Sequence, residues 1–85
     1  MKHKQQIKIK AIQIIENVIT LTYNVRNGCA SDKAALEIES KRLPEIKIWA
    51  EENNMLQDIK HYFSCTNFGF DMGIIRTQVV SFLYN

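Results

Sequence analysis

The sequence predicts a small α+β domain, in which a small antiparallel sheet packs against one or two helices. Three observations lead to this prediction. Apolar and polar residues alternate between residues 7 and 25, Pro44 can start a helix in the middle of the chain, and β-branched and aromatic residues fill residues 74–84. The sheet should therefore combine an N-terminal β-hairpin with one or two C-terminal strands. A chain of 85 residues has room for one domain, residues 1–85.

The predicted hairpin rests on an alternation with a period of two residues. Eight of the ten odd positions from 7 to 25 are apolar, whereas the even positions from 8 to 26 have only Ile12, Ile14 and Val18. Residues 6–15 and 18–26 would be the two strands, joined at Glu16 and Asn17, which are weak strand formers. The odd face of this hairpin would then pack on the core.

The same stretch also fits an amphipathic helix. Apolar residues recur every three or four positions, at Ile7, Ala11, Ile14, Val18, Leu21 and Val25. Polar residues recur in the same way, at Gln6, Lys10, Gln13, Asn17, Thr20 and Asn24. We prefer the hairpin because Ile, Val, Thr and Tyr, which dominate the stretch, lose side-chain freedom in a helix.

The middle of the chain predicts helices. Gly28 can adopt positive φ and ends the first element, after which Ser31 or Asp32 caps a helix over residues 33–42. This helix is expected to bury four apolar side chains, those of Ala35, Leu36, Ile38 and Leu43. A second helix begins at Pro44, which suits a first turn. It should bend or break at Asn53 and Asn54, and a short strand over residues 45–50 is the alternative.

The C-terminal region predicts a strand. Residues 71–73 fit a three-residue hairpin connection with Gly73 in the left-handed conformation, and residues 74–84 would form the strand. A helical alternative exists here too. It would place four apolar residues on one face, namely Met72, Ile75, Val79 and Phe82.

The charges are distributed unevenly along the chain. Residues 1–43 carry eight Lys and Arg against four Asp and Glu, a net charge of +4, whereas residues 44–85 carry three against five, a net charge of −2. Residues 1–6 are expected to form a flexible basic arm. No apolar run has the length of a signal peptide core or a membrane span. We therefore expect a cytoplasmic protein in which Cys29 and Cys65 are reduced thiols.

The chain contains no catalytic or cofactor motif, so we expect a protein that is not an enzyme and has no cofactor and no metal. His61 and Cys65 are four residues apart, which could bring together two metal ligands or a Cys–His nucleophilic pair. A metal site would need a third ligand, from Cys29 or His3. Catalysis would need an orienting group and an oxyanion site, which the sequence does not identify.

The most economical interpretation is a non-enzymatic protein-interaction module. The abundance of Ile, Asn and Lys suggests an AT-rich coding sequence, and hence a phage or mobile-element protein that inhibits or regulates a bacterial host protein or complex, for example a nuclease or an immune complex. A homodimer is compatible with an unpaired outer strand of the hairpin. No membrane partner is expected.

Three surfaces are expected to bind the partner. They are the basic N-terminal region, the apolar patch near the hairpin turn, and a loop with aromatic residues. Their residues are Lys2, Lys4, Lys8, Lys10, Ile12, Ile14, Val18, Arg26, Phe68, Phe70 and Met72.

The alternative function is that of a small nucleic-acid-binding transcriptional regulator, which would use the basic N-terminal half. It requires Arg26, Lys33, Lys41 and Arg42 to gather on one side of the molecule.

Overall fold

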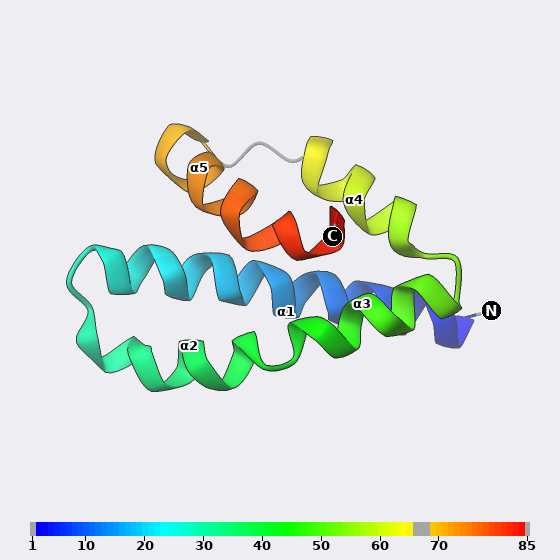
Figure 1. Cartoon of the computed structure of the whole chain (residues 1–85), viewed down its shortest axis with the longest axis horizontal. Coiled ribbons are helices and arrows are strands. Elements are labelled where there is room, and N and C mark those ends of the chain that lie inside the picture. Colours follow the sequence, from blue (N-terminus) through cyan, green and yellow to red (C-terminus); the bar gives the residue numbers. More distant parts are fainter. Residues whose placement is uncertain (1, 66–68, 85) are drawn as a thin grey trace.

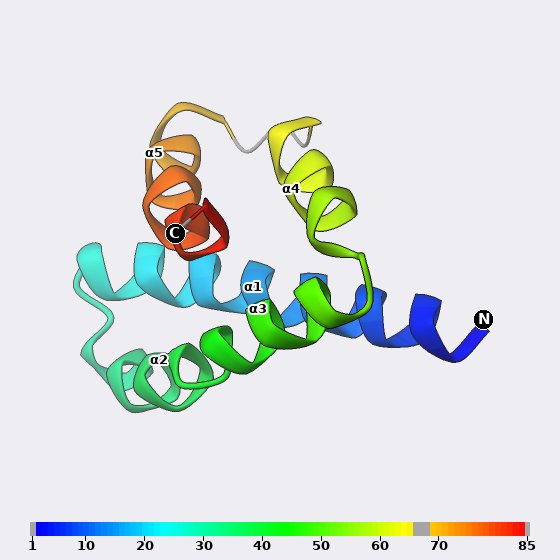
Figure 2. The same cartoon turned by 45° about the vertical axis from the view of Figure 1, so that its right-hand side comes forward.

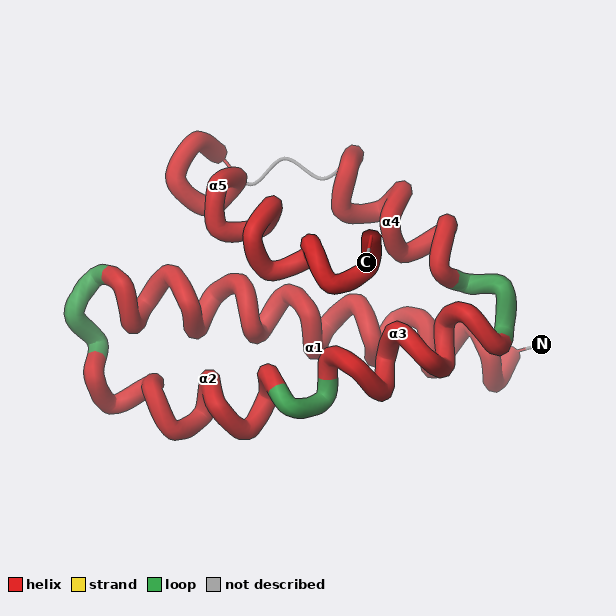
Figure 3. The backbone as a smooth tube through the Cα atoms, in the orientation of Figure 1, coloured by secondary structure: helices red, strands yellow, loops and turns green. Residues whose placement is uncertain are grey.

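Every regular element of the computed structural model, which describes residues 2–65 and 69–84, is a helix (Figures 1 and 3). The predicted α+β fold is therefore wrong, since neither the N-terminal hairpin nor the C-terminal strand forms. The five α-helices are α1 (Lys2–Arg26), α2 (Lys33–Ser40), α3 (Leu43–Glu52), α4 (Leu56–Cys65) and α5 (Gly69–Val80). Two 3-10 turns, Ala30–Asp32 and Ser81–Tyr84, precede α2 and follow α5.

Helix α1 is the central element of the molecule. Helices α2 and α3 run back along one side of it, and α4 and α5 lie on the other side (Figures 1 and 2). Ile15 and Ile19 of α1 are completely buried between these layers. The core that surrounds them contains residues from every later helix except α2: Ile46, Ala50, Ile59, Phe63, Ile75, Val80 and Leu83.

Residues 7–26 form a helix because a helix buries more of their apolar side chains than a hairpin would. The hairpin leaves Ile12, Ile14 and Val18 on its outer face, whereas α1 buries Ile12 and Val18 and half-buries Ile14. A β-branched residue costs roughly 0.5 kcal/mol in a helix, and burying its side chain stabilises the fold by about 2 kcal/mol. The polar stripe of the helical alternative is the solvent-facing side of α1, with only Asn24 half-buried.

The turn at Gly28 was predicted correctly, whereas the predicted capping of α2 by the side chain of Asp32 is wrong. Gly28 has a φ of +96° and follows the end of α1. Asp32 occupies the N-cap position of α2, yet its side chain makes no capping bond. Instead its carboxylate accepts a hydrogen bond of 3.0 Å from the Nδ2 of Asn24, which ties the start of α2 to α1.

Helix α2 is less buried than the sequence predicts. It contains no buried residue, because Ala35 and Ile38 are exposed and Leu36 is only half-buried. Leu43, at the start of α3, is also half-buried. The prediction failed because it assumed that the apolar face of residues 33–42 covers a sheet.

The boundaries at Pro44 and at the two asparagines are confirmed. Pro44 lies in the first turn of α3, and α3 ends at Glu52. Asn54 follows with a φ of +57°, and the amide of Met55 donates to the carbonyl of Ala50 at 2.8 Å. The alternative of a strand over residues 45–50 is wrong, because these residues lie within α3.

The C-terminal helical alternative describes the structure, and the predicted hairpin connection at residues 71–73 is wrong. Ile75 is buried, and Met72, Val79 and Phe82 are half-buried against the core. The positive φ is at Gly69, with +78°, and not at Gly73. Residues 69–80 prefer a helix because this face packs on α1, where the Nη2 of Arg26 donates to the Oε1 of Gln78 at 2.6 Å.

Two further side-chain contacts join α4 to α1. The hydroxyl of Tyr62 donates to the Oε2 of Glu16 at 2.8 Å, and the Nζ of Lys8 lies 4.0 Å from the Oδ2 of Asp58. Residues 2–6, expected as a flexible arm, are the first residues of α1. Over the described ranges, no helix combines the length and the apolar content that crossing a bilayer requires.

Two matched substitutions in α1 separate the helix from the hairpin. Ile12 is 9% exposed and Ile9 is 54% exposed, whereas the hairpin would bury Ile9 and expose Ile12. We expect Ile12→Ala to lower the free energy of unfolding by about 2–4 kcal/mol and Ile9→Ala to change it by less than about 1 kcal/mol. Urea unfolding followed by circular dichroism measures both, and the reverse order of the two effects would contradict the helix.

Candidate functional site

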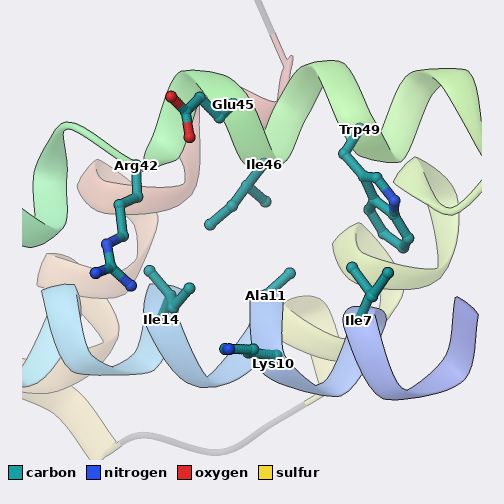
Figure 4. A pocket seen from close by; sticks show the side chains of 8 residues that line it. All are labelled: Ile7, Lys10, Ala11, Ile14, Arg42, Glu45, Ile46 and Trp49. Carbon is teal, nitrogen blue, oxygen red and sulfur yellow. The ribbon is translucent and has the colours of Figure 1, made fainter. Parts of the chain in front are cut away.

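An open groove with a volume of about 450 Å³ lies between α1 and α3 (Figure 4). Each side of the groove is one stripe of a helix. From α1 come Ile7, Lys10, Ala11 and Ile14, and from the start of α3 come Arg42, Glu45, Ile46 and Trp49. Both sets have the spacing i, i+3, i+4, i+7, which places four side chains on one face over two helical turns.

The floor and walls of the groove are apolar. Ala11 and Ile46 are buried and face each other across the space between the two helices, while Ile7, Ile14 and Trp49 are half-buried (Figure 4). The indole of Trp49 points towards Ile7 at one end, and Arg42 extends towards Ile14 at the other.

Charged side chains form the edges of the groove. Lys10 lies along the α1 edge, the guanidinium of Arg42 comes down beside Ile14, and the carboxylate of Glu45 stays on the α3 side (Figure 4). All three residues are exposed. The groove therefore offers an apolar surface next to two cationic groups and one anionic group, without a polar site deep inside it.

Two of the residues predicted from sequence meet in this groove. Lys10 and Ile14 line it, whereas Ile12 and Val18 are buried within the helical bundle. These last two and Ile14 were singled out as an apolar patch on the open face of a sheet, and that reason disappears with the sheet.

The other predicted basic residues lie apart from the groove. Lys4 is exposed near the start of α1, Lys8 turns towards Asp58 of α4, and Arg26 contacts Gln78 of α5. Arg26 is 16 residues after Lys10, about 24 Å along the helix. The basic side chains are thus divided between the two ends and the two sides of α1.

The predicted aromatic loop falls mostly outside the described part of the chain. Phe68 lies outside the described residues, as do the side chains of Phe70 and Lys2. Met72 is half-buried in α5 and packs against the core.

Sequence reasoning missed the larger part of the groove. Five of its lining residues, namely Ile7, Ala11, Glu45, Ile46 and Trp49, were not among those expected to bind a partner. The repeated i, i+3, i+4, i+7 spacing at residues 42–49 was the available signal. This spacing indicates a groove only once the structure shows that α1 and α3 are neighbours.

The pair of His61 and Cys65 does form, at the end of α4. The Sγ of Cys65 lies 3.5 Å from the Nε2 and 3.8 Å from the Nδ1 of His61, and both residues are exposed. Among the residues that the structure describes, no three His, Cys, Asp or Glu side chains are placed to hold a metal ion. The pair remains an isolated contact on the surface.

A second hollow, between α4 and the C-terminal part of the chain, has a volume of about 460 Å³. Its lining includes Tyr84 and three residues with aliphatic hydroxyls, Ser64, Thr77 and Ser81. Each aliphatic hydroxyl donates to a backbone carbonyl three or four residues earlier, at 2.9, 3.0 and 2.8 Å respectively. Arg76 donates to the carbonyl of Phe63 across the hollow. These polar groups act inside the fold, which makes the α1–α3 groove the better candidate for binding.

No protein family, curated protein or solved structure matches this chain. The groove is therefore interpreted from its own residues.

The packing of Ile7 on Trp49 can be tested with the fluorescence of Trp49, the only tryptophan of the chain. Ile7→Ala should expose the indole, so acrylamide should quench its fluorescence more strongly and the protein should lose about 1 kcal/mol of stability. Gln6→Ala, at the exposed neighbouring position, is the matched control. Equal quenching in the two variants would show that Ile7 does not cover Trp49.

Proposed function

We propose that this protein is a small non-enzymatic interaction module that holds another protein in the groove between α1 and α3. The observation that carries the proposal is the pair of apolar stripes, two helical turns long, that face each other without filling the space between them. A folded helical pair normally closes such a seam with its own side chains.

The residue types in the groove support a protein as the bound partner. Trp and Arg are enriched among the residues that dominate binding energies, and Trp49 and Arg42 are both in this groove. Small-molecule sites, in contrast, surround their ligand and orient it with convergent polar groups. Here the charged side chains are at the edges and the centre is aliphatic.

The composition of the chain supports a more specific role. We propose a cytoplasmic phage- or mobile-element-type inhibitor or regulator, with a bacterial host protein or complex as its partner. The AT-rich character of the sequence motivates this part of the proposal. Nucleic-acid binding is the less favoured alternative, because Lys10 and Arg42 lie at the groove whereas Arg26 lies about 24 Å further along α1, beside Gln78.

The proposal is tested by removing one wall of the groove without changing the charge. We expect Ile14→Ser to weaken capture of the partner from nuclease-treated host lysate by about tenfold, the loss typical of a central apolar contact. Gln13→Ser, at the exposed position beside it, should leave capture unchanged. Circular dichroism of both variants checks that they remain folded.

Two outcomes would contradict the proposal. Equal capture by Ile14→Ser and Gln13→Ser would place the binding surface elsewhere. Capture that disappears on nuclease treatment and falls steeply with salt would favour the nucleic-acid alternative.

A further inference from the structure

We infer that the α1–α3 groove takes a single amphipathic helix of the partner, with apolar anchors on one face and acidic side chains along the edge of that face. This inference rests on the proposed function, and it names the structure and charge of the segment that is bound. Three properties of the groove lead to it: the helical origin of both walls, its length, and the charges at its edges.

The walls of the groove favour a helix as the occupant. A β-strand partner needs an open strand edge, and residues 2–65 and 69–84 contain no strand. A polyproline segment needs a groove lined by several aromatic rings, whereas Trp49 is the only aromatic residue among the eight that line this one. Two neighbouring helices with apolar stripes form the kind of trough in which a third helix packs.

The length of the groove sets the number of anchors. From Ile7 to Ile14 the groove follows α1 for about 10 Å, which is two helical turns. An occupying helix therefore contacts it over two turns, with apolar side chains at i, i+3 or i+4, and i+7. The anchors contact the half-buried side chains of Ile7, Ile14 and Trp49, because Ala11 and Ile46 below them are already buried.

The charges favour an acidic occupant. Lys10 and Arg42 both line the groove, and Glu45 is the one acidic residue among its lining residues. Helix α1 itself carries Lys2, Lys4, Lys8, Lys10 and Arg26 against Glu16, a net charge of +4. A helix with Asp or Glu beside its apolar anchors would meet the two cationic groups at the edges.

A second copy of this chain fits the groove less well. The outer sides of α2 and α3 both carry acidic residues, but each of these helices exposes one large apolar side chain, Ile38 in α2 and Ile48 in α3. Helix α1, the longest helix, is basic and would be repelled. The occupant is therefore a segment of a different protein.

Two matched libraries of displayed 14-residue helices test the inference against the full-length protein. Both randomise apolar residues at the three anchor positions, and the flanking positions are fixed as Glu in one library and Lys in the other. We expect binders from the Glu library only. Replacing a central residue of a selected peptide by Pro should abolish its binding, because Pro breaks the helix.

Charge-reversal variants locate the binding site of the selected peptides. Lys10→Glu combined with Arg42→Glu should weaken binding by about tenfold, since two attractive contacts become repulsive. Lys33→Glu combined with Lys41→Glu is the matched control, because both double variants change the net charge from +2 to −2 and the residues of the control are exposed outside the groove. The control should bind within twofold of the unchanged protein.

Three results would overturn the inference. Binders from the Lys library, or from neither library, would exclude an acidic helix as the occupant. Equal weakening by the two double variants would show a general charge effect and no groove contact. A dimer in size-exclusion chromatography that Ile14→Ser dissociates would identify a second copy as the occupant. If Ile14→Ser still removed capture from lysate, an unsuccessful library selection would leave the proposed function standing.

Discussion

The burial of α1 between two helical layers is the constraint on which the rest of the structure depends. Ile15 and Ile19 are fully enclosed, with α3 on one side and α4 and α5 on the other. The two layers also meet each other, where α3 contacts α4 and the 3-10 turn Ser81–Tyr84. Polar contacts join α1 to α4 and α5, from Glu16 with Tyr62 to Arg26 with Gln78. Both layers thus pack on α1 as well as on each other (Figures 1 and 2).

The groove is a consequence of the same arrangement. Helix α1 carries apolar residues around much of its circumference, and the two layers do not cover all of them. Ile7 and Ile14 remain half-buried on the side of α3, where they line the groove on either side of the buried Ala11. The surface available to a partner is therefore apolar surface that the fold leaves uncovered.

Three local signals in the sequence were reliable, whereas the turn predicted at Gly73 and the choice between helix and strand were wrong. Gly28, Pro44 and Asn54 mark turns or helix starts through their own backbone preferences, and the structure places all three as expected. Residues 7–25 fit both periodicities. The choice between the two periodicities depends on whether neighbouring elements cover one face of this stretch or two sides of it. No local property of Ile12 reveals which of these applies.

The candidate site was partly foreseen, for a different reason from the one the structure gives. Ile14 drew attention because an apolar residue had no place on the solvent face of a sheet, and it lies at the edge of an apolar groove. The residue that faces it across the groove, Arg42, is 28 residues further along the chain. Local sequence patterns do not show which residues so far apart in the chain are neighbours in space. The two stripes could therefore be recognised separately, but their pairing across the groove could not be predicted.

Helix α2 lies along α1 and contributes no residue to the buried core. It buries no residue, and the carboxylate of Asp32 at its N-cap accepts a hydrogen bond from Asn24 of α1. Segments with so little buried apolar surface open at a lower free energy than the whole domain. Arg42 stands where this segment joins α3, at one end of the groove. A local opening of α2 would therefore reach Arg42 before it reaches Ile15 and Ile19, so the Arg42 end of the groove is the part of the binding surface most directly joined to this segment.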